Sequence, residues 1–169
     1  MILSRRRVSF DRVTELVWVG SRVASRDDYR RLCAQGIRAC VDMKQEGADP
    51  WAFEAFLWLP TPDHEPPTEI HLRLGVAFLR ECEAAGLPVF VTCQAGVGRS
   101  PTLVLAHLLS GRLRDAGVET ALEFLQARRP LVRPSPGQIE AARRAAFGLG
   151  ETSPSLDPMA RGTSSPPGA

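Results

Sequence analysis

Residue types that commonly bind transition metals are scarce in this chain. Its 169 residues include three histidines and four cysteines, and no two cysteines form a Cys-x-x-Cys pair. The spacing between the cysteines and the histidines matches no zinc motif either. We therefore expect no metal ion and no cofactor, and we expect the cysteines to be reduced thiols of an intracellular protein. The four cysteines are Cys33, Cys40, Cys82 and Cys93.

The chain also lacks a strong excess of charge and a long apolar run. Its 21 lysines and arginines against 19 aspartates and glutamates leave a net charge of +2, which is too small to indicate a nucleic-acid partner by itself. No apolar stretch is long enough for a signal peptide or a membrane span. We therefore predict a cytoplasmic monomer with neither a nucleic-acid partner nor a membrane partner.

The length and composition are those of one globular domain. A chain of 169 residues with 44% hydrophobic residues has enough apolar side chains for a sizeable core. From residue 150 onward, serine, proline and glycine dominate, and such a segment cannot bury enough apolar surface to order itself. We predict a folded unit at residues 1–149 and a disordered tail at residues 150–169.

Short apolar runs alternate with segments of helical periodicity. The runs predict strands at residues 16–20, 37–41, 56–59 and 89–92, and the periodic segments predict helices near 26–35, 69–85, 101–109, 118–128 and 138–147. The prolines between residues 60 and 67 predict a loop. This alternation predicts a single α/β domain whose central, mostly parallel sheet has about four to five strands flanked by helices. A ligand site is expected at the carboxyl ends of the strands.

The stretch from Val89 to Leu109 changes from strand to loop to helix within a few residues. Its strand ends just before Cys93, and two glycines, Gly96 and Gly98, precede Arg99. Glycine lets a loop approach a ligand closely, and successive backbone N–H groups beside a helix N-terminus form an anion site. The planar guanidinium of Arg99 could hold two oxygens of a phosphate. The segment therefore predicts a phosphate-binding loop.

Cys93 is the predicted nucleophile of this loop. A thiol that faces such positive potential should have a lowered pKa and should react as a thiolate near neutral pH. Ser100 follows Arg99, and its hydroxyl could donate a hydrogen bond to the sulfur. That bond would stabilise the thiolate and help it to leave in a second step.

The segment Cys93-x5-Arg99-Ser100, which follows an apolar strand and precedes a helix, resembles the phosphate-binding loop of the cysteine-dependent protein tyrosine phosphatases. Its flanking sequence is most similar to the small dual-specificity branch of that superfamily. The resemblance implies a protein tyrosine phosphatase-like fold, with residues 1–149 as the catalytic domain. The family usually has histidine before its cysteine, and this chain has Thr92. The residues that the resemblance assigns to phosphate binding are Gln94, Ala95, Gly96, Val97, Gly98 and Arg99.

The reaction of this family needs a second chemical group, an acid that protonates the leaving oxygen of the ester. Asp63 lies 30 residues before Cys93 in the proline-rich loop, and the family places its acid in an equivalent loop at similar spacing. We therefore expect Asp63 to be the general acid and base. Its neighbours His64 and Glu65 could substitute for it, and Asp49 is a more distant alternative.

The function that the resemblance implies is metal-independent hydrolysis of phosphate monoesters in two steps. Cys93 would form a phosphocysteine while Asp63 protonates the leaving oxygen, and water would then release phosphate with Asp63 as the base. No basic side chain lies between Cys93 and Arg99, which favours a singly phosphorylated substrate. We expect phosphotyrosine in proteins, with phosphoserine, phosphothreonine or a small phosphomonoester as alternatives.

Two other functions fit parts of the pattern. A phosphate-binding module without turnover, a pseudophosphatase, would keep the loop and Arg99, and Thr92 in place of histidine leaves this function open. A rhodanese-like sulfurtransferase also places a cysteine in an anion-binding loop. It would not need Asp63, and it gives no reason for Ser100 directly after Arg99.

Two further features have open interpretations. Arg129 and Arg133 either lie at the mouth of the site, as similar arginines do in relatives, or they are charges of a helix end and a solvated loop. Cys40 lies on a strand predicted to neighbour the strand of Cys93. It is either a plain buried cysteine or a thiol that forms a disulfide with an oxidised Cys93.

Overall fold

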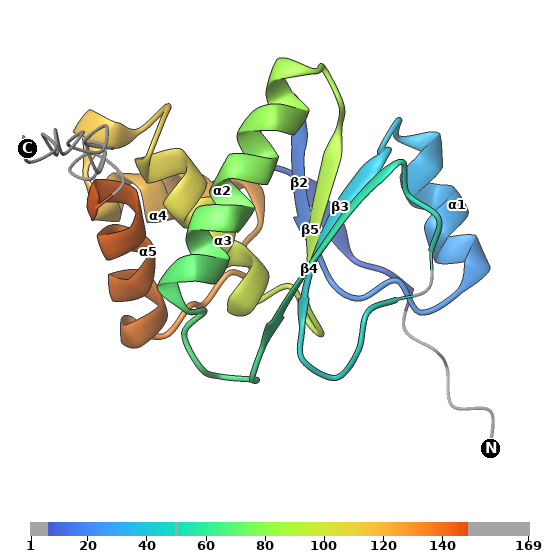
Figure 1. Ribbon diagram of the computed structural model, residues 1–169, viewed down its shortest axis with the longest axis horizontal. Coiled ribbons are helices and arrows are strands. Elements are labelled where there is room, and N and C mark those ends of the chain that lie inside the picture. The colour runs from blue at the N-terminus through green and yellow to red at the C-terminus, as the bar shows by residue number, and fades with distance from the viewer. Residues whose placement is uncertain (1–6, 50, 149–169) are drawn as a thin grey trace, which may run out of the picture.

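The described residues, 7–49 and 51–148 of the computed structural model, form a five-stranded sheet with helices on both faces (Figure 1). The strands are β1 (Phe10–Arg12), β2 (Val17–Gly20), β3 (Ala39–Lys44), β4 (Ala55–Thr61) and β5 (Val89–Thr92). They lie in the order β1-β2-β5-β3-β4. β1 is antiparallel to β2, and the other neighbours are parallel. This confirms the predicted α/β domain with a mostly parallel sheet.

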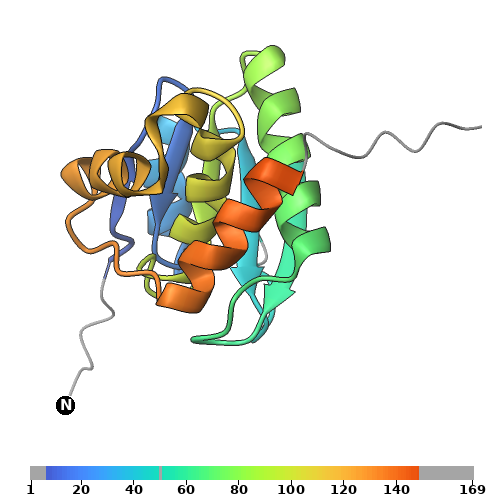
Figure 2. The ribbon, with the colours of Figure 1, turned by 90° about the vertical axis from the view of Figure 1, so that its left-hand side faces the viewer.

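One helix covers one face of the sheet, and the others gather on the opposite face (Figure 1 and Figure 2). α1 (Arg26–Ala34) lies on the first face, where Leu32 shares a core with Cys40 and Phe90. α3 (Arg99–Leu109) is buried along its whole length between the sheet and the helices around it. The second face carries α2 (Glu69–Ala84), α3, α4 (Val118–Arg128) and α5 (Pro136–Gly148), with a 3-10 turn, η1 (Arg114–Ala116), before α4.

The structure shifts the bounds of β3, predicted at 37–41, and of α5, predicted from residue 138. Three other differences have a physical reason. The sequence pattern does not predict β1, which is a short segment with two charged residues and forms through antiparallel pairing with β2. β4 continues through Pro60, where a break is predicted, because an edge strand tolerates proline. α3 begins at Arg99 rather than at Pro101, because the first turn of a helix also tolerates proline.

Some predictions concern residues that the structure does not describe. The predicted disordered tail at residues 150–169 lies outside the described residues, as do residues 1–6, 50 and 149. The tail and its boundary therefore stay predictions. Within residues 7–49 and 51–148, no helix is both long enough and apolar enough to span a membrane.

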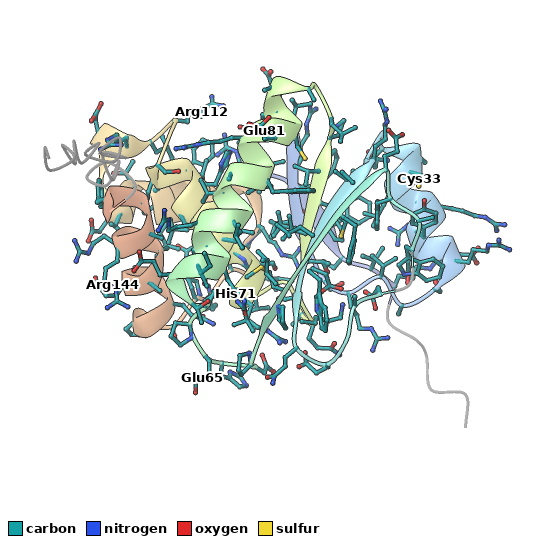
Figure 3. All side chains as sticks on the ribbon, in the orientation of Figure 1. Cys33, Glu65, His71, Glu81, Arg112 and Arg144 are labelled. Atoms are coloured by element: carbon teal, nitrogen blue, oxygen red, sulfur yellow. The ribbon has the colours of Figure 1, made fainter. Side chains whose placement is uncertain are left out.

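The carboxyl ends of the parallel strands meet at one edge of the sheet, the lower edge in Figure 1. The register aligns Gly20 of β2 and Asp42 of β3 with Thr92 of β5, the residue before Cys93. The loop that follows β4 reaches the same edge, where Figure 3 shows Glu65. The sheet thus brings several loops together around Cys93, at the edge where ligands of parallel sheets bind.

Candidate active site

The loop between β5 and α3, residues 93–98, surrounds the sulfur of Cys93. This residue is buried, with 3% of its surface exposed. Its Sγ accepts hydrogen bonds from the backbone N of Gly96 at 3.3 Å and from Oγ of Ser100 at 3.2 Å. Both donors favour negative charge on the sulfur. A cavity of about 320 Å³ opens at this loop, and its lining includes Cys93, Gln94, Ala95, Val97, Gly98, Arg99 and Asp63.

Gly96 lets the loop pack directly on the end of β2, and Gly20 lets that end pack against β1 and the residue before it. Gly96 has a φ of 68°, in the left-handed region that glycine favours. A Cβ on Gly96 would lie 2.4 Å from the backbone carbonyl carbon of Gly20, and a Cβ on Gly20 would lie 2.3 Å from the carbonyl oxygen of Ser9. A side chain at either glycine would therefore push the loop or β1 out of place.

Arg99 contributes a buried guanidinium whose NH2 group donates no hydrogen bond to the described residues. It is 2% exposed, and its NH1 donates to the carbonyl of Thr61 at 2.9 Å and to the carboxylate of Glu46 at 3.0 Å. Its NH2 lies 3.2 Å from Oδ1 of Asp63, yet no atom of the described residues accepts a hydrogen bond from NH2. The N–H bonds of this buried NH2 group therefore remain available as donors at the cavity that Cys93 also lines.

Acidic neighbours favour the charged form of Arg99. Burial disfavours the guanidinium cation, but the hydrogen bond to Glu46 and the negative charges of Cys93 and Asp63 raise the pKa of Arg99 above its ordinary value. The same hydrogen bond lowers the pKa of Glu46. The loop after β3 thus holds Arg99 through Glu46, which no motif in the sequence indicates because it lies 53 residues before its partner.

Asp63 lies in the loop after β4 and lines the same cavity as Cys93. Its side chain is 54% exposed, and its Oδ1 accepts a hydrogen bond from the backbone N of His64 at 3.1 Å. His64 also lines the cavity, and its φ of 64° is uncommon for a residue with a side chain. The structure thus brings together the expected acid and the expected nucleophile.

The two other acid candidates lie elsewhere. The carbonyl of Glu65 accepts a hydrogen bond from Gln138 at 3.1 Å, but Glu65 does not line the cavity. Asp49 is held by Nζ of Lys44 at 3.1 Å and by the backbone N of Val23 at 2.9 Å. Asp63 and His64 are therefore the candidates that reach the cavity.

The two arginines that follow α4 occupy different positions. Arg129 is fully buried, and its Nε donates to the carbonyl of Gly96 at 2.8 Å while its NH1 pairs with Asp11 of β1 at 2.6 Å. Arg129 is the C-cap residue of α4, as the helix-end interpretation predicts. Its guanidinium does not lie at the mouth of the site but is buried, where it holds the loop to β1. Arg133 lines the cavity, as one interpretation predicts, and its backbone N donates to the carbonyl of Val97 at 2.8 Å.

Cys40 and Cys93 belong to cores on opposite faces of the sheet. Cys40 pairs with Phe90 of β5, and both side chains pack in the core on the α1 side. Cys93 packs in the larger core on the other side. Burial raises the pKa of the Cys40 thiol well above its ordinary value. The interpretation of Cys40 as a disulfide partner of Cys93 is therefore wrong, and Cys40 is a core cysteine.

Sequence reasoning missed the residues that support the site from a distance. They are Glu46, which holds Arg99, Asp11, which holds Arg129, and Gln138, which lines the cavity. Of these, only Gln138 has a local signal, because Ser135-x-x-Gln138 is a helix capping pattern. In the part of the chain that the structure describes, no three histidine, cysteine, aspartate or glutamate side chains are placed to hold a metal ion.

Residues 17–144 match the family described as dual specificity phosphatase, catalytic domain. Mouse dual specificity protein phosphatase 15 is 34% identical over 73 residues, which cover 43% of this chain and 30% of that protein. Mouse dual specificity protein phosphatase 1 is 31% identical over 128 residues, which cover 73% of this chain and 33% of that protein. The chain thus spans about a third of the length of these curated relatives. The crystal structure of PTPMT1 in complex with PI(5)P is 25% identical with a TM-score of 0.72, and the match covers 83% of this chain and 96% of that chain.

Proposed function

Since the chain belongs to the dual specificity phosphatase family, as its phosphate-binding motif predicts, we propose that it hydrolyses phosphate monoesters through a phosphocysteine on Cys93. The observation that carries this proposal is the shared cavity. A buried thiol, an arginine with an unsatisfied NH2 group and the carboxylate of Asp63 line the same space. Each of the three groups supplies a different part of one reaction.

In the first step, the thiolate of Cys93 attacks phosphorus, and the bond between phosphorus and the leaving oxygen breaks. The NH2 group of Arg99, which donates no hydrogen bond within the described residues, and the N–H groups of the loop bind the phosphate oxygens of the transition state. Asp63 donates its proton to the leaving oxygen. Because Glu46 and Thr61 already hold Arg99, the guanidinium needs little reorganisation to bind phosphate.

In the second step, water attacks the phosphocysteine and releases inorganic phosphate. Asp63, now a carboxylate, takes a proton from the water. The bond between sulfur and phosphorus breaks, and Ser100 stabilises the departing thiolate through its 3.2 Å hydrogen bond to Sγ. This step restores the protonated Asp63 and the thiolate with which the cycle began.

The proposed substrate is phosphotyrosine in proteins, with phosphoserine, phosphothreonine and small phosphomonoesters as alternatives. The loop side chains that line the cavity before Arg99 are those of Gln94, Ala95 and Val97, and none is charged. These loop side chains offer no extra ion pair to a multiply phosphorylated headgroup, and Arg133 is the other arginine that lines the cavity. A relative of known structure, PTPMT1, was crystallised with PI(5)P. Turnover of phosphotyrosine and phosphoserine peptides against that of PI(5)P therefore tests the substrate class.

The two other functions find less support at the site. Thr92 donates its hydroxyl to the carbonyl of Cys93 at 3.2 Å, so it does not reach the rest of the loop as an ordering group. Arg129 holds the carbonyls of Ala95 and Gly96 instead. Asp63, which a pseudophosphatase would not need, lines the cavity and supports turnover. A rhodanese-like sulfurtransferase would not need Asp63 as a general acid at the cavity that Cys93 lines.

Hydrolysis of para-nitrophenyl phosphate in the presence of EDTA tests the proposed function. Cys93→Ser should lower kcat by a factor of about 10³ or more, because it removes the nucleophile. Asp63→Asn should lower kcat/KM for phenyl phosphate by about 10² or more and remove the loss of activity that follows deprotonation of the acid at higher pH. A wild-type protein that binds vanadate or phosphate but turns over no substrate between about pH 5 and pH 8 would instead be a phosphate-recognition module.

A further inference from the structure

We propose that Gln138 is a positioning residue that holds the loop of Asp63 against the phosphate-binding loop, an inference that rests on the proposed function. Gln138 lies in the first turn of α5 and is 2% exposed. Its side chain contacts three segments: the start of α5, the loop after β4 and the phosphate-binding loop.

The hydrogen bonds of Gln138 define the orientation of its amide. Oε1 accepts from the backbone N of Ser135 at 2.9 Å, and the backbone N of Gln138 donates to Oγ of Ser135 at 3.2 Å. This reciprocal pair is a capping box at the start of α5. Because the N–H of Ser135 requires an acceptor, the amide oxygen faces it. Nε2 is thereby directed to the other side, where it donates to the carbonyl of Glu65 at 3.1 Å.

The loop that receives this bond, residues 62–67, has little capacity to anchor itself. Three of its six residues are prolines, which have no N–H to donate. His64 has a positive φ, and the backbone N of Glu65 bonds within the loop, to the carbonyl of Pro62 at 3.3 Å. Asp63 meets Arg99 through an ion pair at 3.2 Å. Gln138 therefore supplies a buried anchor two residues after Asp63.

Gln138 also packs against the phosphate-binding loop. A Cβ added to Gly98 would lie 2.9 Å from Oε1 of Gln138, so the backbone of Gly98 is in close contact with the amide. One side chain thus spans the gap between the loop of the acid and the loop of the nucleophile. Its length and its amide set the separation between Asp63 and Cys93, on which proton transfer to the leaving oxygen depends.

Two substitutions separate the two functions of this amide. Gln138→Glu keeps the acceptor of the capping box, which glutamate supplies as well as glutamine, but removes the donor to Glu65. Gln138→Met keeps the length of the side chain and removes both groups. If the methionine variant does not fold, the glutamate variant still tests the positioning role, because the start of α5 remains capped.

The measurement is kcat/KM on two substrates with different leaving groups. Para-nitrophenolate departs readily without a proton, whereas the phenolate of phenyl phosphate requires protonation. We expect kcat/KM of both Gln138 variants to fall about tenfold on phenyl phosphate and less than about threefold on para-nitrophenyl phosphate. A change that merely loosened the phosphate-binding loop would lower both values equally.

Asp63→Asn is the reference variant. Its kcat/KM should also fall more on phenyl phosphate than on para-nitrophenyl phosphate, and the fall on phenyl phosphate should be larger than in the Gln138 variants. Gln126→Met is the matched control, because Nε2 of Gln126 donates to the carbonyl of Val132 at 3.2 Å, in a different loop, and it should affect both substrates alike. If Asp63→Asn is selective and the Gln138 variants are not, the positioning role is wrong and the proposed function stands. If Asp63→Asn itself shows no selectivity, Asp63 is not the acid, and both its role in the proposed reaction and the positioning role of Gln138 are wrong.

Discussion

The sulfur of Cys93 meets two hydrogen-bond donors of different kinds. The N–H of Gly96 belongs to the backbone of the loop, whereas the hydroxyl of Ser100 can rotate. Both donors stabilise the thiolate before it attacks. In the phosphocysteine the sulfur carries little negative charge, and charge returns only as the bond to phosphorus breaks. The hydroxyl of Ser100 therefore matters most in the second step of the proposed reaction.

We expect Ser100→Ala to lower kcat about tenfold or more by slowing hydrolysis of the phosphocysteine. Release of para-nitrophenol should then show a rapid burst equal to the enzyme concentration, followed by slow turnover. Stopped-flow absorbance measures this burst. Ser110→Ala is the control at the other end of α3, where the hydroxyl donates to the carbonyl of His107, and it should show no burst. Slow turnover of Ser100→Ala without a burst would place the defect in the first step.

The ion pair of Glu46 with Arg99 gives the folded protein a pH-dependent stability. The hydrogen bond from Arg99 lowers the pKa of Glu46 in the folded state, so the pair stabilises the fold above the unfolded pKa of the carboxyl. This contribution disappears as the pH falls through the lowered folded pKa. Because the Glu46 side chain is 49% exposed, solvent screens the pair and limits its contribution to less than about 1 kcal/mol.

Glu46→Gln should therefore be less stable than wild type near neutral pH and equally stable in acid. Urea unfolding at several pH values measures the difference. Glu123→Gln, at an exposed glutamate for which the structure shows no ion pair among residues 7–49 and 51–148, should give a difference that does not change with pH. A deficit of Glu46→Gln that persists in acid would show that the carboxylate charge is not its cause.

At the scale of elements, the end of β3 carries a buried ionic cluster that holds the loop of Glu46. Nζ of Lys44 lies 2.6 Å from Oδ2 of Asp42 and 3.1 Å from Oδ2 of Asp49. Oδ2 of Asp42 also accepts from the backbone N of Asp49 at 3.1 Å. These bonds close the short loop between Lys44 and Asp49, and from that loop Glu46 reaches Arg99.

We expect Lys44→Met to lower the free energy of unfolding by about 3–5 kcal/mol, because it leaves two largely buried carboxylates without their cation. Chemical denaturation measures the change. Arg38→Met is the control, since the Arg38–Glu54 pair is more than half exposed and its loss should change stability little. Equal stabilities of Lys44→Met and wild type would mean that the carboxylates are satisfied without Lys44.

The contrast between local and distant contacts explains what the sequence could predict. Cys93, Arg99 and Ser100 lie on one strand-loop-helix segment, so their spacing alone indicates how they meet. Asp63 could be proposed because its loop follows a recognisable strand. The partners Glu46 and Gln138 join the site across 53 and 73 residues. Their positions depend on the order of strands in the sheet, which apolar periodicity does not specify.

At the scale of the whole molecule, Arg129 joins both ends of the domain at the phosphate-binding loop. Its guanidinium bonds Asp11 of β1, 118 residues away, and the carbonyls of Ala95 and Gly96. A buried arginine in this position fixes the loop backbone whose N–H groups bind phosphate in the proposed reaction.

The cytoplasmic location, the monomeric state and the lack of nucleic-acid and membrane partners stay predictions at this scale.

Arg129→Met should weaken phosphate binding without changing the preference for one leaving group over another. We expect the KM for para-nitrophenyl phosphate and the inhibition constant of vanadate to rise about tenfold. Steady-state kinetics measures both. Arg128→Met is the matched control, because Arg128 is exposed and stacks over the ring of Phe124, and it should leave both constants unchanged. If Arg129→Met instead raised the preference for good leaving groups, Arg129 would act by positioning the general acid, Asp63.

Arg129 and Asp11 lie 118 residues apart in the chain, so the ribosome synthesises them at different times. Asp11 and the reactive Cys93 are synthesised before Arg129, which is the last of the three to appear. Until Arg129 has docked between β1 and the loop, the carbonyls of Ala95 and Gly96 lack the donors that hold them. A nascent chain in which Arg129 has not docked therefore carries the thiol in a loop that lacks this anchor, and we expect it to bind phosphate more weakly than the folded domain. The phosphate-binding loop gains this anchor only when β1 and the segment after α4 have met.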